Sequence, residues 1–237
     1  MKSHFLTLLF VFLAILCSAK PFPVAVDGRP VAEILLKPDA DITLRHAAEE
    51  LQKWLREITG AELPIVAKPG DAPRRIRLSA ADDVLKRFPA DAARLKGTDG
   101  YAVRPDGDDL CLFGATSKGV LNGVYRLLRR NTDIIWARPD EALGTIFTAT
   151  PTLTLWDDDH IDVPAFGLRG WKTPFPLTGV DLTWNVRQCA NWGTQPMDKA
   201  VWEAKKEWGV QQEFPFGHNI TVMYMQRGRY WKEHPEW

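Results

Sequence analysis

The chain has 237 residues, and its 30 lysines and arginines are balanced by 30 aspartates and glutamates. A chain without net charge gives no electrostatic case for binding nucleic acid or an anionic membrane surface. Its three cysteines show no Cys-x-x-Cys or Cys/His spacing, so neither a disulfide framework nor a zinc site is expected. We expect no metal, no cofactor, and a length that suits one domain and part of a second.

The first 19 residues are typical of a cleavable secretory signal peptide. Lys2 and His4 precede an apolar run, Phe5 to Leu16, that only Thr7 interrupts, and small residues lead to Ala19. A signal core needs about 7–15 apolar residues, whereas a membrane-spanning helix needs about 20. We therefore expect cleavage after Ala19, export to the periplasm or the extracellular space, and no stable membrane insertion afterwards. An uncleaved membrane anchor is the alternative.

Residues 20–156 are predicted to form an α/β (α+β-like) domain with two main helices on a mixed sheet. Apolar or alternating runs predict strands, and apolar residues three and four apart predict helices. In chain order these are a strand at 31–37, a helix between the N-cap Asp41 and Gly60, strands at 63–67 and 75–78, a weaker helix at 80–88, a hairpin of 101–104 and 110–113, a helix capped by Ser117 and reaching Leu128, and a strand at 133–136.

Gly114, Gly119 and Gly123 follow the hairpin and open the next helix. Glycines at a strand-to-helix turn can cradle a phosphate group with backbone N–H groups. However, the order Ser117-Lys118-Gly119 does not match the Walker pattern, and the dinucleotide-binding spacing is also absent. We therefore interpret Gly114 as a turn residue, and the other two glycines as positions where the helix closely approaches the sheet.

Several segments in this domain carry a family resemblance. AAEELQKWL at 47–55, followed by ITGAELPI at 58–65, resembles the first helix and next strand of the alpha-glucuronidase N-terminal domain. A similar domain precedes the barrel in the β-N-acetylhexosaminidases. GYAV at 100–103, LFGATSKG at 112–119 and GVYRLL at 123–128 resemble its closing hairpin and second helix. The resemblance covers about residues 30–140 and implies a domain that carries no catalytic residue.

Residues 157–237 are predicted to begin a TIM-barrel-like domain after an exposed link at 157–164. Pro164 to Trp171 is predicted as a strand and resembles the first barrel strand of the β-N-acetylhexosaminidases. In that family the arginine of an Arg-Gly pair hydrogen-bonds sugar hydroxyls, which implies that Arg169 binds substrate. A guanidinium offers five N–H donors in a fixed fork, which suits neighbouring hydroxyl oxygens. A structural ion pair of Arg169 is the alternative.

Trp171 and His218 are the other candidate carbohydrate-binding residues. Only two of the ten tryptophans precede residue 150, and aromatic planes stack on the apolar faces of sugar rings. His218 lies beside a glycine after a predicted strand, where it could face a sugar. Ordinary structural roles are the alternative for both residues. Segments at 182–187, 191–192, 216–219 and 230–236 resemble uncharacterised secreted bacterial proteins that join the alpha-glucuronidase-type domain to a barrel of unknown activity.

The catalytic groups of such a barrel cannot be nominated from this sequence. A complete barrel takes about 250 residues and draws its catalytic residues from several strand ends, but only residues 160–237 remain for it. Glycoside hydrolysis normally needs two carboxyl groups across the scissile bond. We therefore expect a truncated chain with an incomplete barrel: the inactive N-terminal portion of a secreted glycoside-hydrolase-like protein acting on polysaccharide. The alternatives are a non-catalytic carbohydrate-binding or cell-surface module, and a domain that only supports a barrel.

Overall fold

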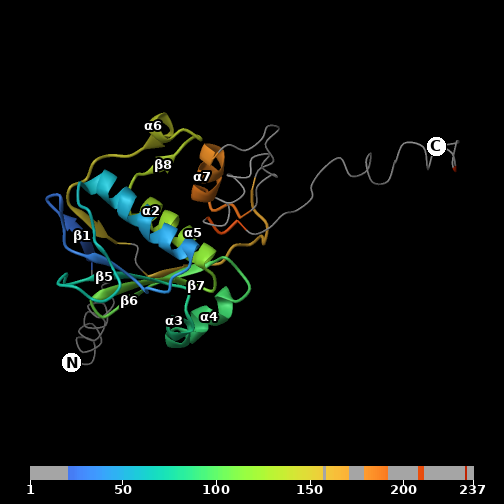
Figure 1. Ribbon diagram of the computed structural model, residues 1–237, viewed down its shortest axis with the longest axis horizontal. Coiled ribbons are helices and arrows are strands. Elements are labelled where there is room, and N and C mark those ends of the chain that lie inside the picture. Colours follow the sequence, from blue (N-terminus) through green and yellow to red (C-terminus); the bar gives the residue numbers. More distant parts are fainter. Residues whose placement is uncertain (1–20, 157–158, 171–178, 192–207, 211–232, 234–237) are drawn as a thin grey trace, which may run out of the picture.

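A mixed six-stranded β-sheet forms the centre of the protein, as predicted (Figure 1). The computed structural model describes residues 21–156, 159–170, 179–191, 208–210 and 233. The strands are β3 (Glu33–Leu36), β4 (Ile65–Val66), β5 (Arg75–Ser79), β6 (Tyr101–Asp106), β7 (Asp109–Gly114) and β11 (His160–Asp162). Their order is β11-β6-β7-β5-β3-β4. The last four in this order pair in parallel, and β6 pairs antiparallel with both of its neighbours.

Two long helices, α2 (Ile42–Thr59) and α5 (Ser117–Asn131), lie side by side on one face of this sheet (Figure 1). The predicted ends of α2 are confirmed. The side chain of Asp41 accepts a hydrogen bond from the Leu44 backbone N–H at 2.8 Å, and so satisfies a donor of the first turn. Gly60 ends the helix at a φ of 76°, a conformation that glycine adopts without steric cost.

The cap expected for α5 is wrong by one residue. Thr116, which has extended backbone angles, accepts the hydrogen bond from the Gly119 backbone N–H at 3.1 Å. Ser117 is already helical, and its hydroxyl donates to the Asp41 carboxylate at 2.6 Å. Both residues have a hydroxyl that can act as a cap, so the sequence alone did not distinguish them. The bond from Ser117 joins the starts of the two long helices.

The glycines of α5 let the helix approach the sheet closely, as interpreted. A Cβ atom added to Gly119 would lie 2.2 Å from the carbonyl oxygen of Gly100. A Cβ atom on Gly123 would lie 2.5 Å from Leu112 and 2.9 Å from the ring of Tyr101. The absence of these two side chains therefore sets the distance between α5 and the hairpin beneath it.

Two short helices, α3 (Asp82–Arg87) and α4 (Pro89–Leu95), lie on the opposite face of the sheet (Figure 1). The helix predicted at 80–88 is confirmed as α3, whereas α4, which follows Phe88, was not predicted. The ring of Phe88 stacks on Phe113 with 5.0 Å between centroids. A small apolar cluster lies beneath these helices: Val84, Leu95, Ala102, Cys111 and Phe113.

Both cysteines in the described part of the chain, Cys111 and Cys189, are buried, and they form no disulfide with each other. Cys111 lies in β7, and Cys189 follows the helix α7 (Gly179–Arg187). Burial, with a smaller contribution from Asp106, raises the pKa of the Cys111 thiol to about 12. A thiol with so high a pKa is unreactive at neutral pH.

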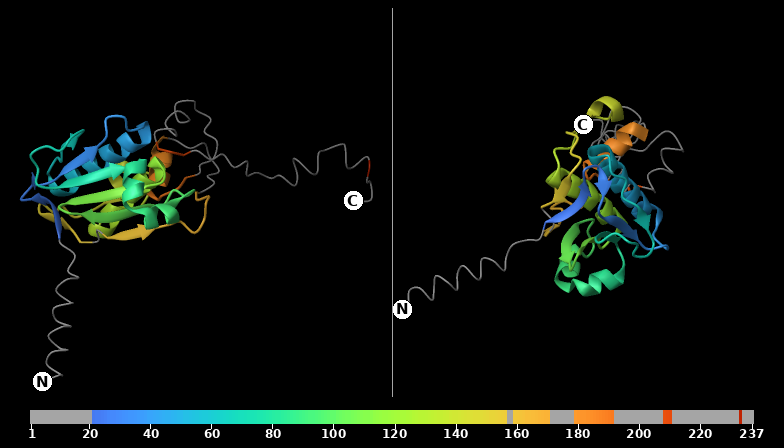
Figure 2. Two further views of the ribbon diagram at one scale, coloured as in Figure 1. Left: turned by 90° about the horizontal axis from the view of Figure 1, so that it is seen from below. Right: turned by 90° about the vertical axis from the view of Figure 1, so that its left-hand side faces the viewer.

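Smaller sheets surround the central one (Figure 2). The strands β1 (Phe22–Val26), β2 (Arg29–Pro30) and β10 (Leu153–Leu155) form an antiparallel sheet in the order β10-β1-β2, which the sequence did not predict. The strand predicted at 133–136 exists as β8 (Ile135–Trp136), but it pairs with β9 (Thr145–Ile146) outside the central sheet. The one-turn helix α6 (Glu141–Gly144) precedes β9.

The segment after residue 156 first adds a strand to the central sheet. The exposed link expected at 157–164 is wrong at β11, because this strand pairs with β6 and extends the central sheet. The strand expected from Pro164 is also wrong, since residues 163–170 have no regular structure. The helix α7 (Gly179–Arg187) then packs against α5. The incomplete barrel stays a prediction.

Several predictions concern residues outside the described ranges. The signal peptide, Trp171 and His218 all lie there. Among the residues that the structure describes, no helix combines the length and the apolar character needed to cross a membrane.

Substituting Gly119 with alanine is expected to destabilise the fold. The new methyl group would overlap the Gly100 carbonyl, and overpacking of this kind costs about 1–3 kcal/mol. Urea unfolding would measure the change. Gly167→Ala is the matched control, because a Cβ atom there meets nothing within 4 Å. Equal stability of the two variants would contradict the close approach of α5.

Candidate functional site

A buried ion pair joins α7 to α2. Arg187 donates from Nε to one oxygen of the Glu50 carboxylate at 3.1 Å and from Nη2 to the other at 3.2 Å. The two side chains are only 6% and 7% exposed. Trp54 donates to the same carboxylate at 3.2 Å, and the Arg187 guanidinium lies 4.8 Å from its ring centroid. A bidentate pair with extra donors is the arrangement that a buried charge requires.

Glu50 and Arg187 each stabilise the charged form of the other. Burial alone would raise the pKa of Glu50, but Arg187, His46 and the Trp54 donor outweigh it and hold that pKa below 4.5. For Arg187, burial lowers the pKa, and Glu50 more than compensates, so the pKa is raised. Both groups are therefore charged in the folded protein at neutral pH.

Two further hydrogen bonds hold α7 against the strand β8. The indole N–H of Trp184 and the side-chain amide of Gln188 both donate to the carbonyl oxygen of Trp136, each at 2.9 Å. A carbonyl oxygen has two lone pairs, so one acceptor satisfies both donors. These bonds place Trp184 beside Trp136.

A cavity of about 280 Å³ opens between α7 and the β8–α6 segment. We call it the tryptophan pocket, and its walls are three tryptophans with polar and charged residues around them: Trp136, Trp184, Trp208, Arg138, Pro139, Asp140, Glu141, Thr145, Thr183 and Arg187. Trp136 is buried, whereas Trp184 and Trp208 are partly exposed. The pocket brings together residues from both parts of the chain.

The polar groups of the tryptophan pocket fall into two kinds. Both carboxylates are engaged: Asp140 accepts from the Leu143 backbone N–H at 2.9 Å, and Glu141 pairs with Lys53 and lies 3.7 Å from Arg187. In contrast, the buried indole N–H groups of Trp136 and Trp208 have no hydrogen-bond partner within the described residues. The aromatic walls suit a small ligand with an apolar face, and the charged and polar residues around them suit its polar groups.

The described residues hold no group of three His, Cys, Asp or Glu side chains that could bind a metal ion.

Arg169, the substrate-binding candidate, lies apart from the tryptophan pocket, in a smaller cavity of about 110 Å³. Its guanidinium donates to the Asp99 carboxylate, to the Cys189 carbonyl at 3.1 and 3.2 Å, and to the Phe166 carbonyl at 2.7 Å. These contacts use four of its five N–H groups. The structural ion pair considered as the alternative is therefore present, and the role in sugar binding stays a prediction.

Sequence reasoning missed the residues that build the pocket. Glu50 lies three residues after Ala47 and four before Trp54, on the predicted buried stripe of its helix. An acidic residue on an apolar stripe needs a buried cation, and this signal was available. The partner, Arg187, could not be identified, because 137 positions separate the two residues in the chain.

No protein-family model matches this sequence, and no curated protein matches it either. Among solved structures, a family GH115 4-O-methyl-alpha-glucuronidase with specificity for decorated arabinogalactans aligns with a TM-score of 0.57 and 17% identity. The alignment covers 90% of this chain and 33% of that enzyme. A mutant Streptomyces plicatus beta-hexosaminidase in complex with GlcNAc aligns with a TM-score of 0.48 and 19% identity, over 74% of this chain and 31% of its own.

The chain thus spans about a third of the length of these structures. At such low identity the likeness to the alpha-glucuronidase concerns the fold alone. The expected likeness to glycoside hydrolases is therefore confirmed for the fold.

Replacing Arg187 with methionine is expected to destabilise the protein by about 3–5 kcal/mol at neutral pH, because Glu50 would stay buried without its cation. In the parent, the lowered pKa of Glu50 contributes stability that is present above pH 4.5 and is lost as the pH falls below it. In the variant, burial alone would raise that pKa, so protonation would relieve the strain. The difference in unfolding free energy between parent and variant should shrink on acidification.

Urea unfolding at pH 7 and pH 4 measures this difference. Arg56→Met is the control, because the ion pairs of Arg56 in the described structure, with Glu57 and Glu62, are exposed, and such pairs contribute about 0–1 kcal/mol. A loss in Arg187→Met as small as in the control would show that the buried pair does not hold α7.

Proposed function

We propose that this chain is the non-catalytic, carbohydrate-binding portion of a secreted glycoside-hydrolase-like protein that acts on polysaccharide. The observation that carries the proposal is the tryptophan pocket between the first domain and α7. The fold, which is also found in a 4-O-methyl-alpha-glucuronidase, is consistent with this role.

The tryptophan pocket combines the features that sugars require. A sugar ring has an apolar face formed by its C–H groups, which stacks on indole planes such as those of Trp184 and Trp208. Its hydroxyl groups can form hydrogen bonds with polar and charged side chains of the pocket walls, such as those of Arg138 and Asp140.

Among the described residues that line it, the same pocket does not offer the machinery of hydrolysis. Glycosidases place two carboxyl groups about 5–9.5 Å apart across the scissile bond, one of them free to protonate the leaving group. Asp140 and Glu141 are adjacent in the chain, and the first caps α6 while the second pairs with Lys53. We therefore assign these side chains to structure and to binding, and the reaction to another part of the whole protein.

The substrate class proposed for the whole protein is a plant-type polysaccharide such as a decorated arabinogalactan, the specificity named for the alpha-glucuronidase of similar fold. A cell-surface carbohydrate-binding module is the alternative with the same ligand chemistry. Arg169 is proposed to position the segment that leads to α7, through its contacts with Asp99 and Cys189.

Arabinogalactan oligosaccharides are expected to bind the purified chain, and Trp208→Ala is expected to weaken that binding. Loss of one aromatic stacking surface costs about 0.5–1.5 kcal/mol, which corresponds to roughly two- to tenfold in Kd. Trp184→Phe should keep most of the affinity, because it retains an aromatic plane. Isothermal titration calorimetry measures the three Kd values.

Trp156→Ala is the matched control, because Trp156 is 70% exposed and lies outside the pocket walls. Equal weakening by Trp156→Ala, or no binding to any oligosaccharide, would favour a domain that only supports a barrel. Release of reducing sugar by the purified chain would contradict the non-catalytic assignment.

Residues 1–19 are proposed to direct export and to be removed. Expression of the complete sequence in a bacterial host should yield an exported protein whose N-terminal residue is Lys20, since the small residues that end at Ala19 suit signal peptidase. Mass spectrometry of the exported protein tests this. An intact Met1 on membrane-bound protein would instead support an uncleaved anchor.

A further inference from the structure

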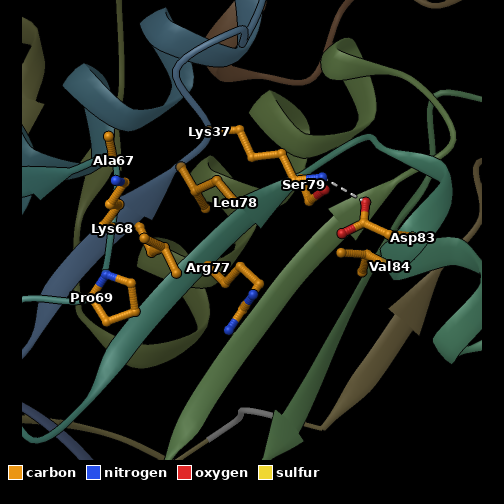
Figure 3. A pocket seen from close by; sticks show the side chains of 10 residues that line it. Lys37, Ala67, Lys68, Pro69, Arg77, Leu78, Ser79, Asp83 and Val84 are labelled. Atoms are coloured by element: carbon orange, nitrogen blue, oxygen red, sulfur yellow. Dashed lines mark hydrogen bonds and ion pairs between the residues drawn. The ribbon is translucent and has the colours of Figure 1, made fainter.

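A second cavity, of about 230 Å³, lies on the other side of the fold, where α3 meets the ends of the parallel strands (Figure 3). We call it the strand-end pocket. Its walls come from the ends of β3 and β5, the segment after β4, and α3: Leu35, Lys37, Ala67, Lys68, Pro69, Arg77, Leu78, Ser79, Asp83 and Val84. The carboxyl ends of parallel strands are where open α/β sheets commonly bind ligands.

The walls of the strand-end pocket carry more positive than negative charge. Lys37, Lys68 and Arg77 face one acid, Asp83. Lys37 and Asp83 neutralise each other through a contact of 2.8 Å. Lys68 has no ion pair within the described part of the chain. Arg77 shares Asp109 with Arg75, and its buried Nε–H finds no acceptor among the described residues.

The segment that carries Lys68 is attached to Glu33 by a hydrogen bond. Glu33, which is only 2% exposed, accepts a hydrogen bond from the Gly70 backbone N–H at 2.7 Å. Figure 3 shows Lys68 and Pro69 on one side of the pocket, Asp83 and Val84 on the other, and Arg77 between them. The hydrogen bond to Glu33 thus ties the segment that carries Lys68 to the start of β3.

The remaining walls are apolar. Leu35, Leu78 and Val84 are buried and line the same cavity. Apolar walls lower the local dielectric constant, so a cation beside them attracts an anion more strongly than it would in open water. The volume is below the range of about 300–1,000 Å³ of drug-sized ligands, and so suits a ligand the size of one sugar ring.

We propose that the strand-end pocket binds a small organic anion, namely the carboxylate or phosphate group of a single acidic sugar. Lys68 and Arg77 contact the anionic group, and the Lys37–Asp83 pair hydrogen-bonds the ring hydroxyls. The site shares no lining residue with the tryptophan pocket, so the two binding proposals can be tested independently.

Titration of the complete chain with D-glucuronate, glucose 6-phosphate and glucose tests the proposal, with Kd measured by NMR chemical-shift changes. At least one of the two anions should bind at least tenfold more tightly than neutral glucose, and its binding should weaken as salt is added. Comparison of the two anions distinguishes a carboxylate from a phosphate ligand. Equal affinity for all three compounds, or no binding of either anion, would overturn the proposal.

Two variants with matched controls locate the site. Lys68→Ala, which removes no ion pair seen in the described structure, should weaken anion binding at least fivefold, and Lys68→Glu should abolish it. Arg77→Ala should weaken it similarly. Arg75→Ala is its control, because Arg75 pairs with the same Asp109 at 2.8 Å but does not line the cavity.

Unchanged binding in Lys68→Ala, or equal losses in Arg75→Ala and Arg77→Ala with both variants folded, would place the anion elsewhere. If Arg77→Ala does not fold, the two Lys68 variants still decide the question.

Discussion

The ion pair between Glu50 and Arg187 is the contact on which the arrangement of this protein depends. It joins a residue of α2 to a residue of α7 through two hydrogen bonds, in a place where water contributes little. A buried charge without its partner is far more costly than an intact pair, so α7 has one favoured position. The tryptophan pocket is a consequence, because Trp184 belongs to that helix.

A second group of hydrogen bonds, centred on Asp99, holds the residues on both sides of α7. The carboxylate of Asp99 accepts hydrogen bonds from Asn122 of α5 at 3.1 Å, from Asn191 at 3.2 Å, and from Arg169. The polypeptide that leads into α7 and out of it is thus attached to the first domain on both sides. Arg169 is the residue that the family resemblance singled out for sugar binding, and its known contacts in this structure are of a structural kind.

The two pockets differ in the chemistry of their walls, and they lie on different sides of the sheet. The tryptophan pocket has aromatic walls, and its carboxylates are already engaged. The strand-end pocket has lysine and arginine at its rim and aliphatic residues in its walls. A neutral sugar suits the first pocket, and an anionic one suits the second.

The sequence by itself determined the features that depend on near neighbours. The caps Asp41 and Gly60, the hairpin of β6 and β7 and the close-packing glycines of α5 were predictable, because turn chemistry and apolar periodicity act within a few residues. Only the tertiary structure decided that β11 completes the central sheet and that Glu50 meets Arg187. Such contacts join residues far apart in the chain, and a residue's type limits its possible partners without selecting one. The binding pockets arise from these long-range contacts.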